Sequence, residues 1–142
     1  MPGAERSIVI NTSPEVLYDV IADYARYPEF LKDISKVTVE EQTDDASVVT
    51  FELNLIKTVR YTIRLSGDRP RTVSWTFVRS NILKSNTGGW VLEDLGNNQT
   101  RATYRLDVSV GMFVPKRIVS TLTGTTLPTT LDAFKRRAES RT

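Results

Sequence analysis

The chain has 142 residues, of which 39% are apolar and 25% are charged, and its formal net charge is +2 at pH 7. This length is typical of one domain, and this apolar content is enough for one hydrophobic core. The low net charge argues against a dedicated nucleic-acid binder, because such proteins carry a dense basic stripe. The sequence has no cysteine, which excludes disulfides and thiol catalysis, and no histidine, which removes the commonest general base and metal ligand. We predict a single domain, residues 1–142, and assign it no metal site, no cofactor and no catalytic residue.

The N-terminal residues MPGAERSIVI lead directly into an expected strand at residues 8–10. They lack the long apolar region of a Sec-type signal peptide. No apolar run in the sequence approaches the ~20 residues that span a bilayer. The sequence therefore predicts a cytoplasmic protein.

An amphipathic helix is predicted directly after this strand. Thr12 and Glu15 stand at capping-box spacing, while Ser13 followed by Pro14 offers an alternative N-cap with proline at the first helical position. The apolar positions that repeat at helical spacing are Val16, Leu17, Val20 and Ile21. One face of this helix must therefore be buried.

Three aromatic residues and a proline follow this helix within seven residues: Tyr24, Tyr27, Pro28 and Phe30. A plain loop has little use for so many aromatic side chains. We predict a second, very short helix here, placed over a cavity or over the sheet.

Six segments between residues 37 and 110 show the period-two alternation of strands. Their apolar positions are Val37 and Val39; Val49, Phe51, Leu53 and Leu55; Val59, Tyr61, Ile63 and Leu65; Val73, Trp75 and Phe77; Trp90 and Leu92; and Ala102, Tyr104, Leu106, Val108 and Val110. Turns are predicted at 43–45, near 57–58, at 67–71 and at 96–98. With the first strand, the pattern predicts a seven-stranded antiparallel meander with one wet face and one covered face.

Helical spacing returns in the C-terminal segment, 116–137, at Ile118, Leu122, Leu131 and Phe134, and it continues at Ala138. Its middle, 120–128, consists largely of small hydroxyl residues and glycine, which form helices poorly and fill little volume. One interpretation is a long helix across the sheet, kinked near Gly124 by Pro128, with a cavity beneath its small residues. The alternative is two helices joined by a threonine-rich loop, the second starting at Thr126 or Leu127. We favour the cavity.

This order of elements is that of the helix-grip fold, an α+β fold in which a seven-stranded antiparallel sheet wraps around a long C-terminal helix, with two short N-terminal helices and an internal cavity. The pattern D-x-x-x-Y-P-E-F-L begins at Asp23, and Trp75, Phe77, Gly89 and Trp90 support it. On these residues the chain resembles the START-like superfamily, and within it the coenzyme Q-binding and polyketide cyclase/dehydrase group.

The resemblance implies a binding module for a hydrophobic small molecule, such as a quinone, isoprenoid, lipid or polyketide, which it would carry or chaperone. Two alternatives stay open. One is a polyketide aromatase/cyclase-like enzyme, and the other is an interaction protein like the ribosome-association toxins, which share the YPEFL block. Inward polar groups that converge on one point of the cavity would favour the enzyme, whereas a wholly apolar cavity would favour the carrier.

Alternation places the aromatic side chains of the later strands on the covered face, where they either pack the core or line a pocket. Gly88 and Gly89 favour a pocket, because missing side chains leave room. Arg79 continues the same series, so it either meets the polar end of a ligand at the pocket mouth or is solvated beyond the strand end. The candidate ligand-binding residues are Tyr24, Tyr27, Phe30, Tyr61, Trp75, Phe77, Arg79, Trp90, Tyr104 and Leu122. In the enzyme alternative, Tyr61 and Arg79 would supply the acid or base.

Two surface features allow a second partner. In the segment 111–117, Met112, Phe113 and Val114 stand beside Lys116 and Arg117, which suits either a transient contact with a membrane surface or a buried connection. We favour the buried connection.

The arginines on the wet face are Arg60, Arg64, Arg101 and Arg105. They suit either a solvated sheet with partners such as Glu52 and Asp107, or an anionic partner such as RNA or the ribosome. We favour the solvated sheet.

Overall fold

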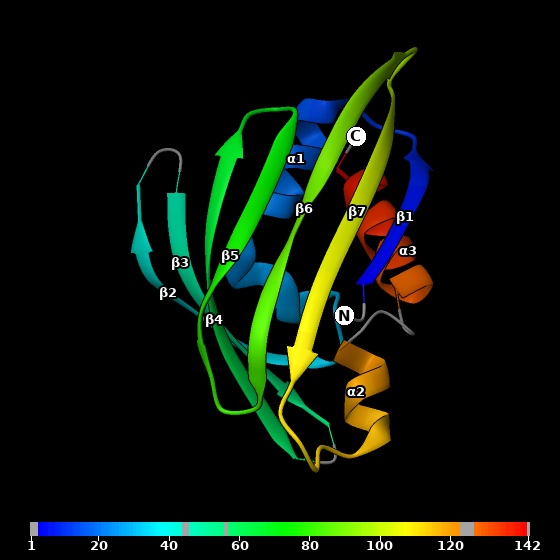
Figure 1. Ribbon diagram of the computed structural model, residues 1–142. Helices are drawn as coiled ribbons and strands as arrows, with labels where there is room; N and C mark the ends of the chain where they lie inside the picture. Colours follow the sequence, from blue (N-terminus) through cyan, green and yellow to red (C-terminus); the bar gives the residue numbers. More distant parts are fainter. Residues whose placement is uncertain (1–2, 44–45, 56, 123–126, 142) are drawn as a thin grey trace.

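Figure 1 shows the computed structural model, which describes residues 3–43, 46–55, 57–122 and 127–141. The elements, in chain order, are β1 (Gly3–Ile10), α1 (Pro14–Ala22), the 3₁₀-helix η1 (Tyr24–Glu29), β2 (Ile34–Gln42), β3 (Ala46–Asn54), β4 (Thr58–Asp68), β5 (Thr72–Ser80), β6 (Leu83–Gly96), β7 (Gln99–Val110), α2 (Lys116–Leu122) and α3 (Leu127–Glu139). None of the helices described in these ranges has the length and apolar content that crossing a lipid bilayer requires.

The strands form one antiparallel sheet in the order β1-β7-β6-β5-β4-β3-β2. The chain therefore runs through β2 to β7 as a meander and places β1 beside β7. In Figure 1, α1, η1 and α3 lie behind the sheet, against one of its faces. The predicted α+β helix-grip arrangement with seven antiparallel strands is confirmed.

Three strand boundaries differ clearly from the prediction, and the first is that of β1, which begins at Gly3 rather than at residue 8. Strand β6 begins at Leu83, well before Trp90, and β4 continues to Asp68 through the predicted turn. The early part of β6 escaped prediction because the sequence LKSNTGG lacks alternating large apolar residues.

The N-terminal helix uses the second of the two predicted caps. Ser13 is the N-cap of α1, and its hydroxyl accepts a hydrogen bond of 3.3 Å from the backbone N–H of Val16. Pro14 occupies the first turn, where its missing N–H has no helical partner to lose. The buried face consists of Pro14, Leu17, Val20 and Ile21.

The described part of the C-terminal segment comprises two helices, α2 and α3, and the second begins at Leu127, as the two-helix alternative expected. The residues between them, 123–126, lie outside the described residues. Pro128 lies in the first turn of α3, where proline breaks no helical hydrogen bond. The buried side chains of α3 are Leu127, Leu131, Phe134 and Ala138, so the predicted apolar stripe faces the core. Gly124, at the kink of the first alternative, lies outside the described residues.

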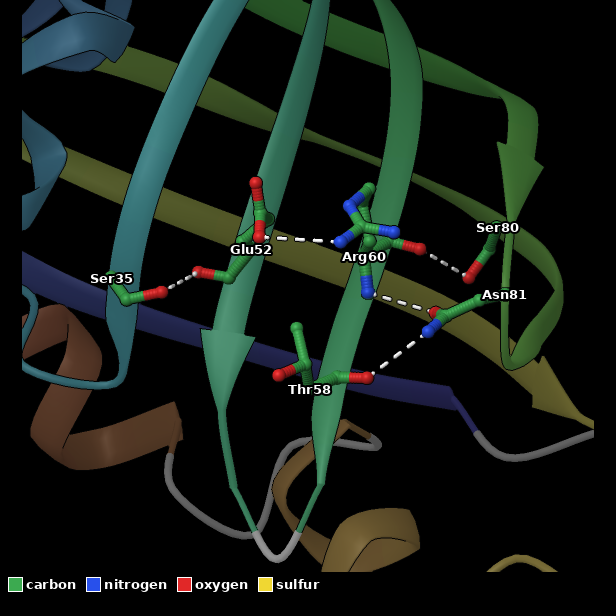
Figure 2. A network of polar contacts seen from close by, with 6 residues as sticks. All are labelled: Ser35, Glu52, Thr58, Arg60, Ser80 and Asn81. Carbon is green, nitrogen blue, oxygen red and sulfur yellow. Dashed lines mark hydrogen bonds and ion pairs between the residues drawn. The ribbon is translucent and has the colours of Figure 1, made fainter.

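Polar contacts join strands β2 to β4 and the β5–β6 turn on the outer face of the sheet (Figure 2). Arg60 contacts the carboxylate of Glu52 at 3.5 Å, and its backbone N–H donates to Asn81 at 2.9 Å. The other hydrogen bonds of this group are donated to backbone carbonyls. The hydroxyl of Ser35 donates to the carbonyl of Glu52, the hydroxyl of Ser80 to the carbonyl of Arg60, and the side-chain amide of Asn81 to the carbonyl of Thr58. The predicted cross-strand pairing of Arg60 with Glu52 is confirmed.

Arg101 and Arg105, the two arginines of β7, do not stand opposite Asp107, the carboxylate that was expected to pair with them. Arg101 stands opposite Glu93 of β6, and Arg105 stands opposite Glu5 of β1. Asp107, the expected partner, is instead opposite Gly3 and Thr87.

Candidate ligand cavity

A cavity of about 440 Å³ lies between the covered face of the sheet and η1, α2 and α3. Cavities that hold small molecules have volumes of roughly 300–1,000 Å³. The aromatic lining residues are Tyr24, Tyr27, Phe30, Phe51, Tyr61, Trp75, Trp90, Tyr104 and Phe134. Aliphatic side chains from β3 to β7 fill the spaces between them, including Leu53, Ile63, Leu65, Val73, Leu106 and Val108.

The aromatic rings contact one another and form a continuous wall. The ring of Trp90 lies 4.9 Å from that of Tyr104 and 5.0 Å from that of Phe134, both in edge-to-face geometry. Tyr61 stacks on Phe51 at 5.4 Å. Such pairs add stability beyond the apolar area they bury and hold each ring in one orientation.

The structure brings most of the predicted site residues together. Those that line the cavity are Tyr24, Tyr27, Phe30, Tyr61, Trp75, Trp90 and Tyr104. Phe77 is half-buried and packs against the core without lining the cavity. Leu122 is the last residue of α2, and its side chain lies outside the described residues.

Arg79 does not reach the cavity, which corrects the expectation that it meets a ligand. The pairing of β4 with β5 shifts between Thr62 and Ile63, so that Thr62 stands opposite Arg79 and Ile63 opposite Phe77. Val78 is the extra residue of this bulge, and a bulge reverses the face on which the following side chain lies. Arg79 is therefore on the outer face, where its guanidinium donates to Glu40 at 2.7 Å.

The short helix η1 is held against α1 and α3. The hydroxyl of Tyr27 donates to the backbone carbonyl of Ile21 at 2.5 Å, which fixes η1 on the end of α1. Arg137 of α3 forms an ion pair of 2.5 Å with Glu29, and its guanidinium lies 5.2 Å from the ring centre of Phe30. The ring of Phe30 also meets that of Phe134 at 5.1 Å. The predicted aromatic cap thus closes one side of the cavity and is joined to both neighbouring helices.

Asn86 is a lining residue that the sequence pattern did not predict. It lies on β6, and its side chain is only 4% exposed. Its Oδ1 accepts a hydrogen bond of 2.8 Å from Nε1 of Trp75. Asn86, Gly88 and Trp90 alternate along β6, so the period-two pattern would have placed Asn86 on the covered face had the strand been extended N-terminal to Trp90.

The three tyrosines of the lining that make no hydrogen bond through their hydroxyl groups to any described residue are Tyr24, Tyr61 and Tyr104. Burial raises the pKa of Tyr61 to about 12, and burial together with the nearby Tyr61 raises the pKa of Tyr104 further. These phenols therefore stay protonated at neutral pH. They can donate or accept hydrogen bonds, but they are poorly matched to proton transfer near pH 7.

Gly88 does not leave free space for a ligand, contrary to the expectation. A Cβ atom at this position would lie 2.7 Å from Cζ2 of Trp75 and 2.2 Å from the backbone oxygen of Arg105. The indole of Trp75 thus occupies the volume that a side chain would fill. The glycine allows the indole of Trp75 to pack closely against β6 and to reach Asn86.

Residues 10–135 match the family model described as polyketide cyclase/dehydrase and lipid transport. The chain belongs to this family. No match was found among curated proteins. The predicted resemblance to the polyketide cyclase/dehydrase group is confirmed.

Several solved structures share the fold of this family member. The Zhui aromatase/cyclase from Streptomyces sp. R1128 is 16% identical, with a TM-score of 0.86 over 98% of this chain and 94% of that chain. A START superfamily protein from Mycobacterium smegmatis is 16% identical, with a TM-score of 0.83 over 99% of both chains. A STAR-related lipid transfer protein from Xanthomonas axonopodis is 14% identical, with a TM-score of 0.77 over 96% of this chain and 85% of that chain.

The connection between β7 and α2 in this polyketide cyclase/dehydrase family member protrudes from the surface. Met112 is 79% exposed and Phe113 is 96% exposed, so the prediction of a buried connection is wrong for these two side chains. Phe113 also has a φ of 66°, in the left-handed region that bulky residues avoid. Only Val114 of the three apolar residues packs against the core.

Proposed function

We propose that this protein binds an apolar small molecule in its cavity and carries or chaperones it. The observation that carries the proposal is the cavity itself, of about 440 Å³ and lined mainly by aromatic and aliphatic side chains. Burying about 300 Å² of apolar ligand surface would contribute roughly 7 kcal/mol before the costs of association. Quinones, isoprenoids, fatty acyl chains and polyketides all fall into this class.

The residues present favour binding over conversion. Tyr61 and Arg79 were the predicted acid or base, but Arg79 lies on the outer face and pairs with Glu40. Burial raises the pKa of Tyr61 to about 12, which makes this phenol a weak general acid or base near pH 7.

A second candidate function is a polyketide aromatase/cyclase. The cavity is not wholly apolar, since Asn86, Tyr61 and Tyr104 present polar groups to it. The fold likeness to the Zhui aromatase/cyclase is compatible with this candidate. An enzyme of this kind would convert a poly-β-ketone, whereas a carrier would return the bound molecule unchanged.

We include a transient contact with a membrane surface in the proposal. Met112 and Phe113 protrude beside Lys116 and Arg117, and the side chain of Lys84 passes next to Gly111. Apolar side chains beside cations bind reversibly to membranes that contain anionic lipids. Coenzyme Q is one candidate cargo, on the resemblance to the coenzyme Q-binding group, and we place its exchange on the cytoplasmic side.

Native mass spectrometry of the purified protein, followed by organic extraction, tests the main proposal. The expected result is a co-purified apolar molecule, or thermal stabilisation by at least one of a quinone, a fatty acid and an aromatic polyketide. Incubation with a poly-β-ketone mimic separates the two candidates, because only an enzyme yields a cyclised product. A protein that is empty and gains no stability from any of these molecules would contradict the carrier function.

A further inference from the structure

Asn86 carries hydrogen-bond donors that no described residue uses. The side chain is 4% exposed and lines the cavity. Its Oδ1 bonds to Trp75, whereas its amide nitrogen Nδ2 has no hydrogen bond to any residue in the described ranges. No buried side-chain nitrogen or oxygen of the described residues is both sealed from solvent and unpaired. The Nδ2 group therefore opens into the cavity.

Trp75 determines which end of the amide faces the cavity. An indole N–H can only donate a hydrogen bond, so the atom of Asn86 that it meets must be the oxygen. The 2.8 Å bond from Nε1 of Trp75 to Oδ1 leaves the two N–H groups of Nδ2 as the exposed part. The indole itself is fixed by the space at Gly88 and by the ring of Tyr104 at 5.6 Å. Asn86 is thus a donor of fixed orientation.

We infer that the ligand carries a hydrogen-bond acceptor, such as a ketone or quinone carbonyl, which receives a hydrogen bond from Nδ2 of Asn86. This inference rests on the proposed binding function and narrows its ligand class. A pure hydrocarbon in the cavity would leave the amide donors unpaired in an apolar surrounding, which is unfavourable. A ligand group that only donates would face the Nδ2 hydrogens and be rejected. Trp75 acts as the positioning residue for this selection.

Three rigid tricyclic molecules of nearly the same shape test the inference. 9-Fluorenone accepts a hydrogen bond through its carbonyl, carbazole donates one through its N–H, and fluorene neither accepts nor donates. Dissociation constants for all three are measured on the same protein by isothermal titration calorimetry. The affinity ratio between two of these molecules cancels any general effect of a substitution on the stability of the cavity. We expect wild-type protein to bind fluorenone more tightly than fluorene and carbazole.

Asn86→Leu should lower the fluorenone-to-fluorene affinity ratio roughly five- to tenfold, the value of one hydrogen bond. Thr121→Val is the matched control, because Thr121 also lines the cavity but its hydroxyl already donates to the carbonyl of Arg117 at 3.0 Å. This control should leave the ratio unchanged. Trp75→Phe frees the amide to rotate, so it should raise the affinity for carbazole relative to fluorenone.

Asn86→Leu leaves the indole N–H of Trp75 without a partner and can impair folding, so two further measurements are included. The double variant Trp75→Phe/Asn86→Leu removes both polar groups together and should show the same loss of the fluorenone preference. In wild-type protein, the side-chain amide resonances of Asn86 should shift on addition of fluorenone and stay in place with fluorene.

The outcomes separate the inference from the function on which it rests. Equal ratios in wild-type protein and the Asn86 variants, or amide resonances that respond alike to fluorenone and fluorene, would overturn the inference while binding in the cavity stands. If none of the three molecules binds, and quinones and fatty acids do not bind either, the proposed function and the inference both fail.

Discussion

Replacing Gly88 with alanine tests whether Trp75 packs on β6 as the structure shows. At most exposed strand positions this substitution is neutral or stabilising, because glycine weakens a strand. At Gly88 the new Cβ would approach Cζ2 of Trp75 to 2.7 Å and the backbone oxygen of Arg105 to 2.2 Å. Both distances are far below van der Waals contact, so the indole and the β6–β7 pairing must move.

The expected loss of stability follows from the cost of overpacking. Inserting an extra carbon into a well-packed core destabilises by about 1–3 kcal/mol. The displaced indole also weakens its hydrogen bond to Asn86, which is worth about 1 kcal/mol. We therefore expect Gly88→Ala to lower the free energy of unfolding by about 2–4 kcal/mol.

Urea unfolding followed by tryptophan fluorescence measures this change. Gly111→Ala is the matched control, because its new Cβ would lie 3.9 Å from the nearest atoms, those of Ile82 and Lys84. The control should stay within about 0.5 kcal/mol of wild type. Equal stability of the two alanine variants would refute the packing of Trp75 against Gly88 and, with it, the fixed orientation of Asn86.

Three further predictions concern pH and the membrane contact. The hydrogen bond from Arg137 lowers the pKa of Glu29 from its ordinary value of 4.5. The ionised Glu29 therefore stabilises the folded protein above pH 4.5, and this stabilisation is lost as the pH falls through the folded-state pKa. The urea midpoint of Glu29→Gln should therefore fall less between pH 7 and pH 3 than that of wild type. Burial raises the pKa of Tyr61 from 10.0 to about 12. The buried neutral phenol therefore stabilises the folded protein fully below pH 10, and this stabilisation is lost as the pH rises toward 12. In an absorbance titration, Tyr61→Phe should show one phenol fewer that ionises late than wild type does. Replacing both Met112 and Phe113 with serine should weaken binding to vesicles with anionic lipids at least tenfold, since each buried apolar side chain is worth about 1.5–3 kcal/mol, and should leave fluorenone binding unchanged.

The alternation of apolar residues was sufficient to predict the sheet. A period of two specifies a strand and its buried face wherever large apolar and polar residues alternate, as from Val59 to Leu65. It gives no signal where small and polar residues face the core. The first half of β6, with Asn86 and Gly88, was missed for that reason. Asn86, the polar residue of the cavity on which the ligand inference rests, lies in this part of β6.

Arg79 and Gly88 show where tertiary contacts overrule a local pattern. The bulge at Val78 moves Arg79 to the outer face. No feature of the preceding sequence predicts this extra residue. The room left by Gly88 is filled by Trp75 from the neighbouring strand, which only the pairing of β5 with β6 reveals.

The contacts of η1 with α1 and α3 determine the route by which a molecule can pass into the interior. A movement of η1 alone would break the Glu29–Arg137 pair, the Phe30–Phe134 contact and the bond from Tyr27 to the end of α1 at the same time. Helix α2 is held far less firmly, because Ile118 is the only fully buried side chain among those that the structure describes in it. Weakly packed elements open before firmly packed ones. We therefore expect a molecule to enter and leave the cavity beside α2 rather than past η1.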